Sequence, residues 1–142
     1  MREILSKYIP EMAVTPCLEM IKLNHVHLKI VNEQTPLKPV SLYSETKVNS
    51  ESLVLDSKSI NFEPCILRFS TVFGISPEMR FDLLLQELIL NAIVYKKILI
   101  FGPDFWRPLI HVKDASNACI RCIKSSSDLI SGEIYNPGKY PQ

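Results

Sequence analysis

The amino-acid sequence predicts an α/β fold, and two observations lead to it. Between residues 42 and 136, helix-like segments are interspersed with strand-like segments, which is typical of α/β proteins. One strand-like segment, residues 62–69 (FEPCILRF), is a short run of bulky apolar side chains, as expected for a strand buried on both faces of a parallel sheet. With 142 residues, the chain suits one domain with one core.

The first predicted helix covers residues 42–57. Ser41 stands just before it, at the N-cap, where a side-chain oxygen can accept a hydrogen bond from a free backbone amide. Glu45 lies in the first turn, where negative charge favours the positive end of a helix. The strand at residues 62–69 follows, and residues 70–74 (STVFG) are expected to form a loop.

A second helix is predicted to begin at Phe81 and to continue past Ala92, because apolar residues recur there at helical spacing. Lys96 and Lys97 suit its C-terminal end. The remaining expected elements are strands at residues 98–101 and 109–112, a turn at residues 102–104, a helix over residues 113–124, a polar loop over residues 125–132 and a last strand at residues 133–136.

The composition excludes several classes of protein. Apolar residues make up 46% of the chain and charged residues 22%, as in soluble globular proteins. The chain has sixteen basic and fifteen acidic residues, so the charge balance implies no nucleic-acid partner. The most apolar stretch, residues 81–101, is interrupted by charged and amide side chains, so no membrane span is expected. The N-terminus carries charges where a signal peptide needs an apolar core, which predicts a cytoplasmic protein.

The cysteines and histidines suggest no metal site. Cys119 and Cys122 have the spacing of a redox or zinc half-site, but no second pair follows them, so structural burial of one or both thiols is the favoured interpretation. His25 and His27 would point to the same side of a strand, which is one arrangement that metals use. Because no third ligand lies nearby in the sequence, a metal is not expected there.

The pair Tyr43 and Lys47 is the first candidate for chemistry. Residues four apart share one face of a helix, so both side chains can act on one small molecule. A phenol with a pKa near 10 is a poor base at neutral pH. A fixed ammonium about 4 Å away, at an effective dielectric of about 20, favours the phenolate by about 4 kcal/mol. This corresponds to at most about three pKa units, and would let the phenol accept a proton from a hydroxyl while hydride leaves the same carbon.

Such a pair is common on exposed helices, so the surrounding residues decide its meaning. Residues 39–51, PVSLYSETKVNSE, resemble the active-site helix of the extended short-chain dehydrogenase/reductase family, in which Tyr-x-x-x-Lys follows a proline and precedes a glutamate, here Glu51. Further segments are similar to the family's later signatures in the same order: LRFSTVFG at residues 67–74, RFDL at residues 80–83, WRPLIHVKD at residues 106–114 and YNPG at residues 135–138. The likeness best suits the nucleotide-sugar epimerases and dehydratases.

This resemblance refines the expected fold. It implies a partial Rossmann-like parallel sheet that lacks the N-terminal glycine-rich half, together with part of a small substrate-binding domain. Residues 36–142 would form this partial domain, and residues 1–35 would be an atypical N-terminal segment.

The resemblance also implies roles for individual residues. Tyr43 would be the general acid or base, and Lys47 would bind the ribose of NAD or NADP and lower the pKa of the phenol. The residues expected beside the nicotinamide are Phe69, Ser70, Thr71 and Val72. The residues expected at the substrate, a UDP-, GDP- or dTDP-sugar, are Thr71, Asp82 and Arg107.

Some of these roles have alternatives. The guanidinium of Arg107 can bind diphosphate oxygens bidentately, although a surface ion pair is the other interpretation. Asp82 would touch substrate or cap its helix, and capping is favoured. Thr71 stands where many relatives have asparagine. His111 and Asp114 are expected to be structural, with Asp114 near the start of a helix.

Two parts of a complete site are missing from the sequence. A dinucleotide site needs a glycine-rich turn before a helix, but none of the chain's four glycines precedes the tyrosine helix. Relatives also carry an upstream serine or threonine that binds the substrate hydroxyl; only Ser6, Thr15 and Thr35 come into question here, and none matches convincingly. We therefore expect the isolated chain to be inactive, as a truncated or frameshifted product or, less favoured, as a half-subunit.

The alternative function is a non-catalytic module. Such a protein would bind a nucleotide sugar through Arg107, or would pair with a full-length relative through the tyrosine helix. A homodimer is a further possibility. Half of a doubly wound sheet would also expose a strand edge, so the fragment is expected to associate with a partner or to be marginally stable.

Overall fold

A computed structural model of the chain describes residues 12–16, 32–100 and 108–137, the first of these as backbone only. It confirms the α/β fold. The elements, in chain order, are β1 (Met12–Pro16), α2 (Leu42–Asp56), β2 (Cys65–Phe69), β3 (Thr71–Phe73), α3 (Leu84–Tyr95), β4 (Leu109–His111), α4 (Val112–Lys124), α5 (Ser127–Ile130) and β5 (Ile134–Tyr135).

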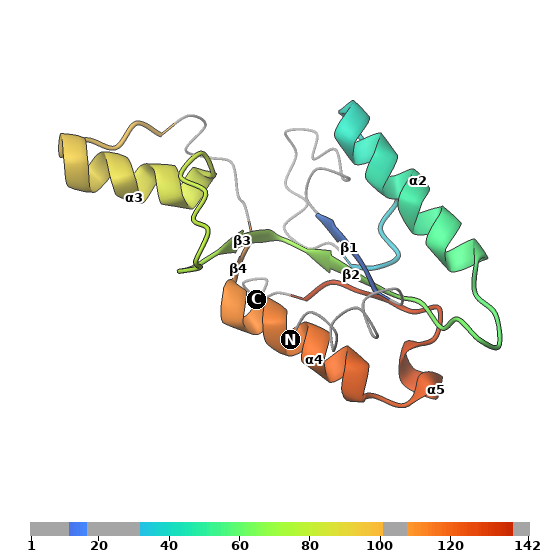
Figure 1. Cartoon of the computed structure of the whole chain (residues 1–142). Helices are drawn as coiled ribbons and strands as arrows, with labels where there is room; N and C mark the ends of the chain where they lie inside the picture. Colours follow the sequence, from blue (N-terminus) through green and yellow to red (C-terminus); the bar gives the residue numbers. More distant parts are fainter. Residues whose placement is uncertain (1–11, 17–31, 101–107, 138–142) are drawn as a thin grey trace.

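The main sheet has the strand order β1-β2-β5, and both pairings are parallel. Helix α2 lies on one side of this sheet, and α4 with α5 lies on the other (Figure 1). The segment before residue 36 contributes β1, which the sequence did not predict. The result is a three-layer arrangement, in which a parallel sheet is covered by helices on both faces.

Strand β2 is the centre of the fold, and all five of its residues are buried, as predicted for a strand covered on both faces. Alternate side chains point to opposite sides of a sheet. Cys65, Leu67 and Phe69 form the core with residues of β4 and α4. Arg68 points to the other side, because its guanidinium binds Glu51 of α2. The strand is shorter than predicted, since residues 62–64 precede it.

Helix α2 begins as the sequence predicts. Ser41 is the N-cap, with extended backbone angles of φ −139° and ψ 157°. Its Oγ accepts a hydrogen bond from the amide of Ser44 at 3.2 Å, and the Oγ of Ser44 accepts one from the amide of Ser41 at 3.0 Å. This reciprocal pair is a capping box. The helix ends at Asp56 with Ser57 as its C-cap, within one residue of the prediction.

A second, two-stranded sheet joins β3 to β4 in parallel, with Thr71 opposite Leu109 and Phe73 opposite His111. The prediction of a loop at residues 70–74 was therefore wrong, because β4 supplies a hydrogen-bonding partner that is distant in sequence. Strand β4 and helix α4 confirm the predictions for residues 109–112 and 113–124, except that Val112 begins the helix. Nδ1 of His111 accepts a hydrogen bond from the amide of Lys113 at 3.2 Å, which caps α4.

Other predictions need correction. Residues 98–100 form no strand, and their side chains are exposed; residue 101 lies outside the described part of the chain. The loop at residues 125–132 contains the short helix α5. Asp82 does not cap α3, whose N-cap is Leu83 without a side-chain bond. Its carboxylate binds Arg80 instead, with Nε and Oδ1 3.1 Å apart.

Helix α3 starts three residues later than predicted, at Leu84, and ends before Lys96, which adopts the left-handed conformation at φ 53°. None of its residues is buried. In Figure 1 it stands apart from the main sheet, beyond β3. Among the described residues, no helix combines the length and hydropathy needed to cross a membrane.

Candidate functional site

The carboxyl end of β2 is the natural place for a ligand, because parallel α/β sheets bind ligands beyond the carboxyl ends of their strands. Ser70 follows β2 directly and is 6% exposed. Its Oγ has no hydrogen-bond partner within the described residues. A buried hydroxyl without a partner is costly, so a ligand that bonded to it would remove a penalty.

Helix α2 brings Tyr43 and Lys47 together, as predicted. Nζ of Lys47 lies over the tyrosine ring, 5.7 Å from its centroid, within the range of a cation–π contact. Tyr43 is 50% exposed, so the phenol is accessible to a ligand. The closer approach of the ammonium to the phenolic oxygen, which would favour the phenolate, stays a prediction.

The side of α2 that faces the sheet carries polar anchors. Ser44 and Glu51 are the helix's two buried residues. The carboxylate of Glu51 binds the guanidinium of Arg68 bidentately, and Nε donates to Oε2 at 3.0 Å. Sequence reasoning noted Glu51 only as part of a motif and missed Arg68. The signal was available, since an arginine within a buried strand needs a partner.

The same guanidinium reaches a second segment. Nη1 of Arg68 donates to the carbonyl oxygen of Glu33 at 3.1 Å. Oε1 of Glu33 in turn accepts a hydrogen bond from the amide of Asn136, just after β5, at 2.9 Å. Arg68 therefore connects α2, β2 and the chain before α2, and Glu33 extends this connection to β5.

The residues that were expected to contact cofactor or substrate lie in different surroundings in the structure. Thr71 and Val72 lie in β3 and are half-buried. The side chain of Phe69 is buried in the core on the α4 side, so a contact from this residue to a nicotinamide would come from its backbone. Asp82 is exposed and paired with Arg80. Arg107, His25 and His27 lie outside the described residues.

The hydroxyls considered for the substrate fall in different places. The Oγ1 of Thr35 donates to Oδ1 of Asn32 at 3.1 Å and accepts from its amide at 3.0 Å, so it closes a local turn. Thr15 lies in β1, where its backbone is in register with Arg68. Ser6 lies outside the described residues.

The described residues fit one end of a dinucleotide better than the other. Ser70, Tyr43 and Lys47 supply polar groups of the kind a nicotinamide riboside needs, and the buried Ser70 hydroxyl has no hydrogen-bond partner within the described residues. The two described glycines, Gly74 and Gly132, have positive φ angles of 128° and 79°, which side chains rarely adopt. A Cβ on Gly74 would lie 2.8 Å from His111 and Val112, and one on Gly132 would lie 3.0 Å from Lys58. Neither forms a phosphate cradle.

Of the pair Cys119 and Cys122, one thiol is buried, as predicted, and Cys119 is half-buried. Cys122 is buried, and its Sγ lies 3.8 Å from that of Cys65. Burial, with the nearby Cys122 as a second cause, raises the pKa of Cys65 to about 12. A buried thiol with a raised pKa is a poor nucleophile. Within the described part of the chain, no group of three or more histidine, cysteine or acidic residues is placed to hold a metal ion.

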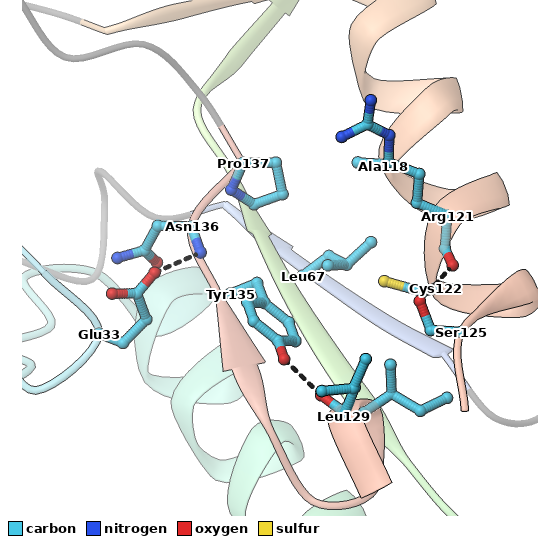
Figure 2. A pocket seen from close by; sticks show the side chains of 11 residues that line it. Glu33, Leu67, Ala118, Arg121, Cys122, Ser125, Leu129, Tyr135, Asn136 and Pro137 are labelled. Atoms are coloured by element: carbon cyan, nitrogen blue, oxygen red, sulfur yellow. Dashed lines mark hydrogen bonds between the residues drawn. The ribbon is translucent and has the colours of Figure 1, made fainter. Parts of the chain in front are cut away.

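A separate pocket of about 420 Å³ lies on the α4 side of the main sheet. Figure 2 shows Tyr135 and Leu67 on one side of it and Arg121 and Cys122 of α4 on the other. The hydroxyl of Tyr135 donates to the carbonyl oxygen of Leu129. Because α2 covers the opposite side of the sheet, this pocket is distinct from the face that carries Tyr43.

Comparison with known proteins gives consistent results. The profile of the NAD dependent epimerase/dehydratase family matches residues 24–138. A curated relative, the uncharacterized UDP-glucose epimerase YtcB of Bacillus subtilis, is 38% identical over 73 residues, which cover 51% of this chain and 22% of that protein.

Two solved structures are similar over nearly the whole chain. The UDP-glucuronic acid 4-epimerase of Bacillus cereus, solved with UDP-glucuronic acid and NAD, has a TM-score of 0.73 at 24% identity and matches 92% of this chain. The dTDP-glucose 4,6-dehydratase of Bacillus anthracis, solved with NAD, has a TM-score of 0.71 at 27% identity and matches 96%. The chain spans only 40% and 43% of their lengths.

Proposed function

Because the chain belongs to the NAD-dependent epimerase/dehydratase family, we propose that it carries the proton-transfer part of a nucleotide-sugar epimerase or dehydratase site. The observation that carries this proposal is the pairing of Tyr43 with Lys47 on a capped helix that is anchored to β2. The strand ends at Ser70, whose buried hydroxyl has no partner within the described residues.

In the proposed mechanism, the chain's own residues orient the sugar and move one proton. Tyr43 accepts the proton of a sugar hydroxyl and returns it in the reverse step. Lys47 holds positive charge beside the ring and would hydrogen-bond the ribose of the cofactor. NAD, when bound, supplies the hydride acceptor. Ser70 would offer its hydroxyl to the nicotinamide end, and Arg107 would bind the diphosphate of the substrate.

The pyrophosphate of the cofactor requires groups that the described residues do not supply. We propose that residues outside the described part of the chain, in the same polypeptide or in a partner such as a full-length relative, supply them wherever the chain takes part in turnover. A second candidate function is a non-catalytic pairing module. It is favoured by the outer surface of α2, where Leu42 is 79% exposed and Leu53 is 67% exposed. Apolar side chains in such positions suit a helix partner.

Binding of a UDP-sugar tests the substrate part of the proposal. Trp106, the only tryptophan, precedes Arg107 directly, so its fluorescence reports on ligands near this arginine. We expect UDP-glucose to change the emission saturably, and Arg107→Lys to weaken binding because an ammonium cannot bind phosphate bidentately. The matched control is Arg80→Lys, whose guanidinium is held by Asp82. An unchanged affinity in Arg107→Lys contradicts the substrate role.

A further inference from the structure

The ion pair between Glu51 and Arg68 is buried, with side chains 5% and 4% exposed. Both carboxylate oxygens take part, one with Nε at 3.0 Å and the other with Nη2. A bidentate pair fixes direction as well as distance, because the planar guanidinium matches the carboxylate in one orientation. The pair therefore joins α2 to β2 in a defined geometry.

Arg68 also holds the chain that leads into α2. Its Nη1 donates to the carbonyl oxygen of Glu33, which lies in the turn closed by Asn32 and Thr35. One guanidinium thus binds the body of α2 through Glu51 and the segment before the helix through Glu33. The first contact restrains the helix itself, and the second restrains the segment that leads into it.

Three apolar side chains of α2, Val48, Val54 and Leu55, are half-buried, and the helix lies against β1. The two buried residues of the helix, Ser44 and Glu51, are polar. Ser44 is engaged in the capping box, so Glu51 is the buried side chain that reaches β2. Replacing a buried ion pair by apolar residues is often neutral or stabilising, so stability alone does not explain the pair. Orientation does.

We propose that Glu51 and Arg68 are positioning residues that set the rotation of α2 and so direct Tyr43 and Lys47 toward the carboxyl end of β2. Tyr43, Lys47 and Glu51 are spaced four residues apart and share one stripe of the helix. A rotation that follows loss of the Glu51 anchor therefore moves the other two side chains with it. The inference rests on the proposed function of Tyr43 and Lys47.

The test is fluorine NMR of the full chain labelled with 3-fluorotyrosine. The chain has five tyrosines, and Tyr43→Phe assigns the resonance of Tyr43. We expect this resonance to shift in Arg68→Lys, which keeps the charge but loses the fork, and in Glu51→Gln, which keeps the shape. The matched control is Cys122→Ala, a buried change on the α4 side. It is expected to leave the Tyr43 resonance in place and to move that of Tyr135.

An unchanged Tyr43 resonance in both folded variants, or an equal shift in Cys122→Ala, overturns the inference. If Arg68→Lys does not fold, Glu51→Asp is measured in the same way, because it keeps the charge and shortens the reach. The measurement needs no ligand. A shift of Tyr43 together with absent ligand binding therefore contradicts the proposed function alone, whereas ligand binding with an unmoved Tyr43 contradicts the positioning role alone.

Discussion

At the scale of single residues, Arg68 shows how a charged side chain can sit inside a buried strand. Burial of an isolated charge is costly, and the cost falls only when a well-oriented partner is present. Glu51 and the carbonyl of Glu33 supply that partner set. The exposed pair of Arg80 and Asp82 is the contrast, because water screens it.

We predict that Arg68→Leu lowers the free energy of unfolding by about 3–5 kcal/mol, since it leaves the Glu51 carboxylate buried without the guanidinium. Urea denaturation followed by circular dichroism measures the change. Arg80→Leu removes the guanidinium of the exposed pair and is expected to have little effect. Equal losses in the two variants would show that burial of the Arg68 pair does not matter.

The Cys65 thiol predicts a pH dependence. Its pKa is raised by burial from 9.0 to about 12, so the folded state holds the proton more tightly than the unfolded state. The stability that the thiol contributes is complete below pH 9.0 and is lost as the pH rises toward 12. We expect the difference in melting temperature between wild type and Cys65→Ala to shrink over this window. A difference that stays constant contradicts the prediction.

At the scale of elements, helix α2 depends on its N-terminal cap. Ser41→Ala removes the hydroxyl that accepts from the amide of Ser44, and such losses typically cost about 1 kcal/mol. The matched control is Ser52→Ala on the exposed side of the same helix, where the hydroxyl only bonds back to the carbonyl of Val48. Chemical denaturation of both variants checks the prediction, which fails if the two changes are equally destabilising.

The elements that sequence reasoning predicted well are those whose signals are local. The cap at Ser41 and the apolar run of β2 can be read from neighbouring residues. Strands β1 and β3 could not be predicted in this way. They have only five and three residues, which show no hydrophobic period and become strands only through partners that are distant in the sequence. Residues 98–100 show the converse, since an apolar run without a described partner forms no strand.

The residues of the candidate site divide in the same way, into those with a local signal in the sequence and those that depend on distant partners. Tyr43 and Lys47 were found because four-residue spacing on a helix is visible in sequence. Arg68 and Glu51 are 17 residues apart, and only the packing of α2 on β2 reveals that they meet. The unpartnered hydroxyl of Ser70 likewise depends on the surrounding structure. Sequence could therefore identify the candidate pair, whereas its anchoring required the fold.

At the scale of the whole molecule, apolar surface remains uncovered on α3. Ile89, Ile93, Val94 and Tyr95 are each more than half exposed, which is unusual for a helix of such hydropathy. Soluble proteins that expose contiguous apolar side chains tend to associate through them. The chain is therefore expected to bind an apolar partner or to self-associate.

We predict that Ile93→Asp weakens self-association and lowers the fluorescence of an apolar dye, with an unchanged circular dichroism spectrum. Sedimentation velocity and dye titration measure these effects. Ile123→Asp on α4 is the matched control, because Ile123 is also exposed but stands on a helix that packs against the main sheet. An equal response in both variants means that α3 is not the surface responsible.

The most direct test of the central claim is saturation-transfer NMR of NAD in the presence of the chain. In the proposed site, this chain supplies the groups for the nicotinamide end, Tyr43 and Lys47, whereas its described residues form no cradle for the pyrophosphate. Transfer should therefore be stronger to the nicotinamide and its ribose than to the adenine. It should fall in Lys47→Met and persist in Lys113→Met, which replaces an exposed lysine of α4. Transfer that favours the adenine, or that survives Lys47→Met unchanged, would contradict the account.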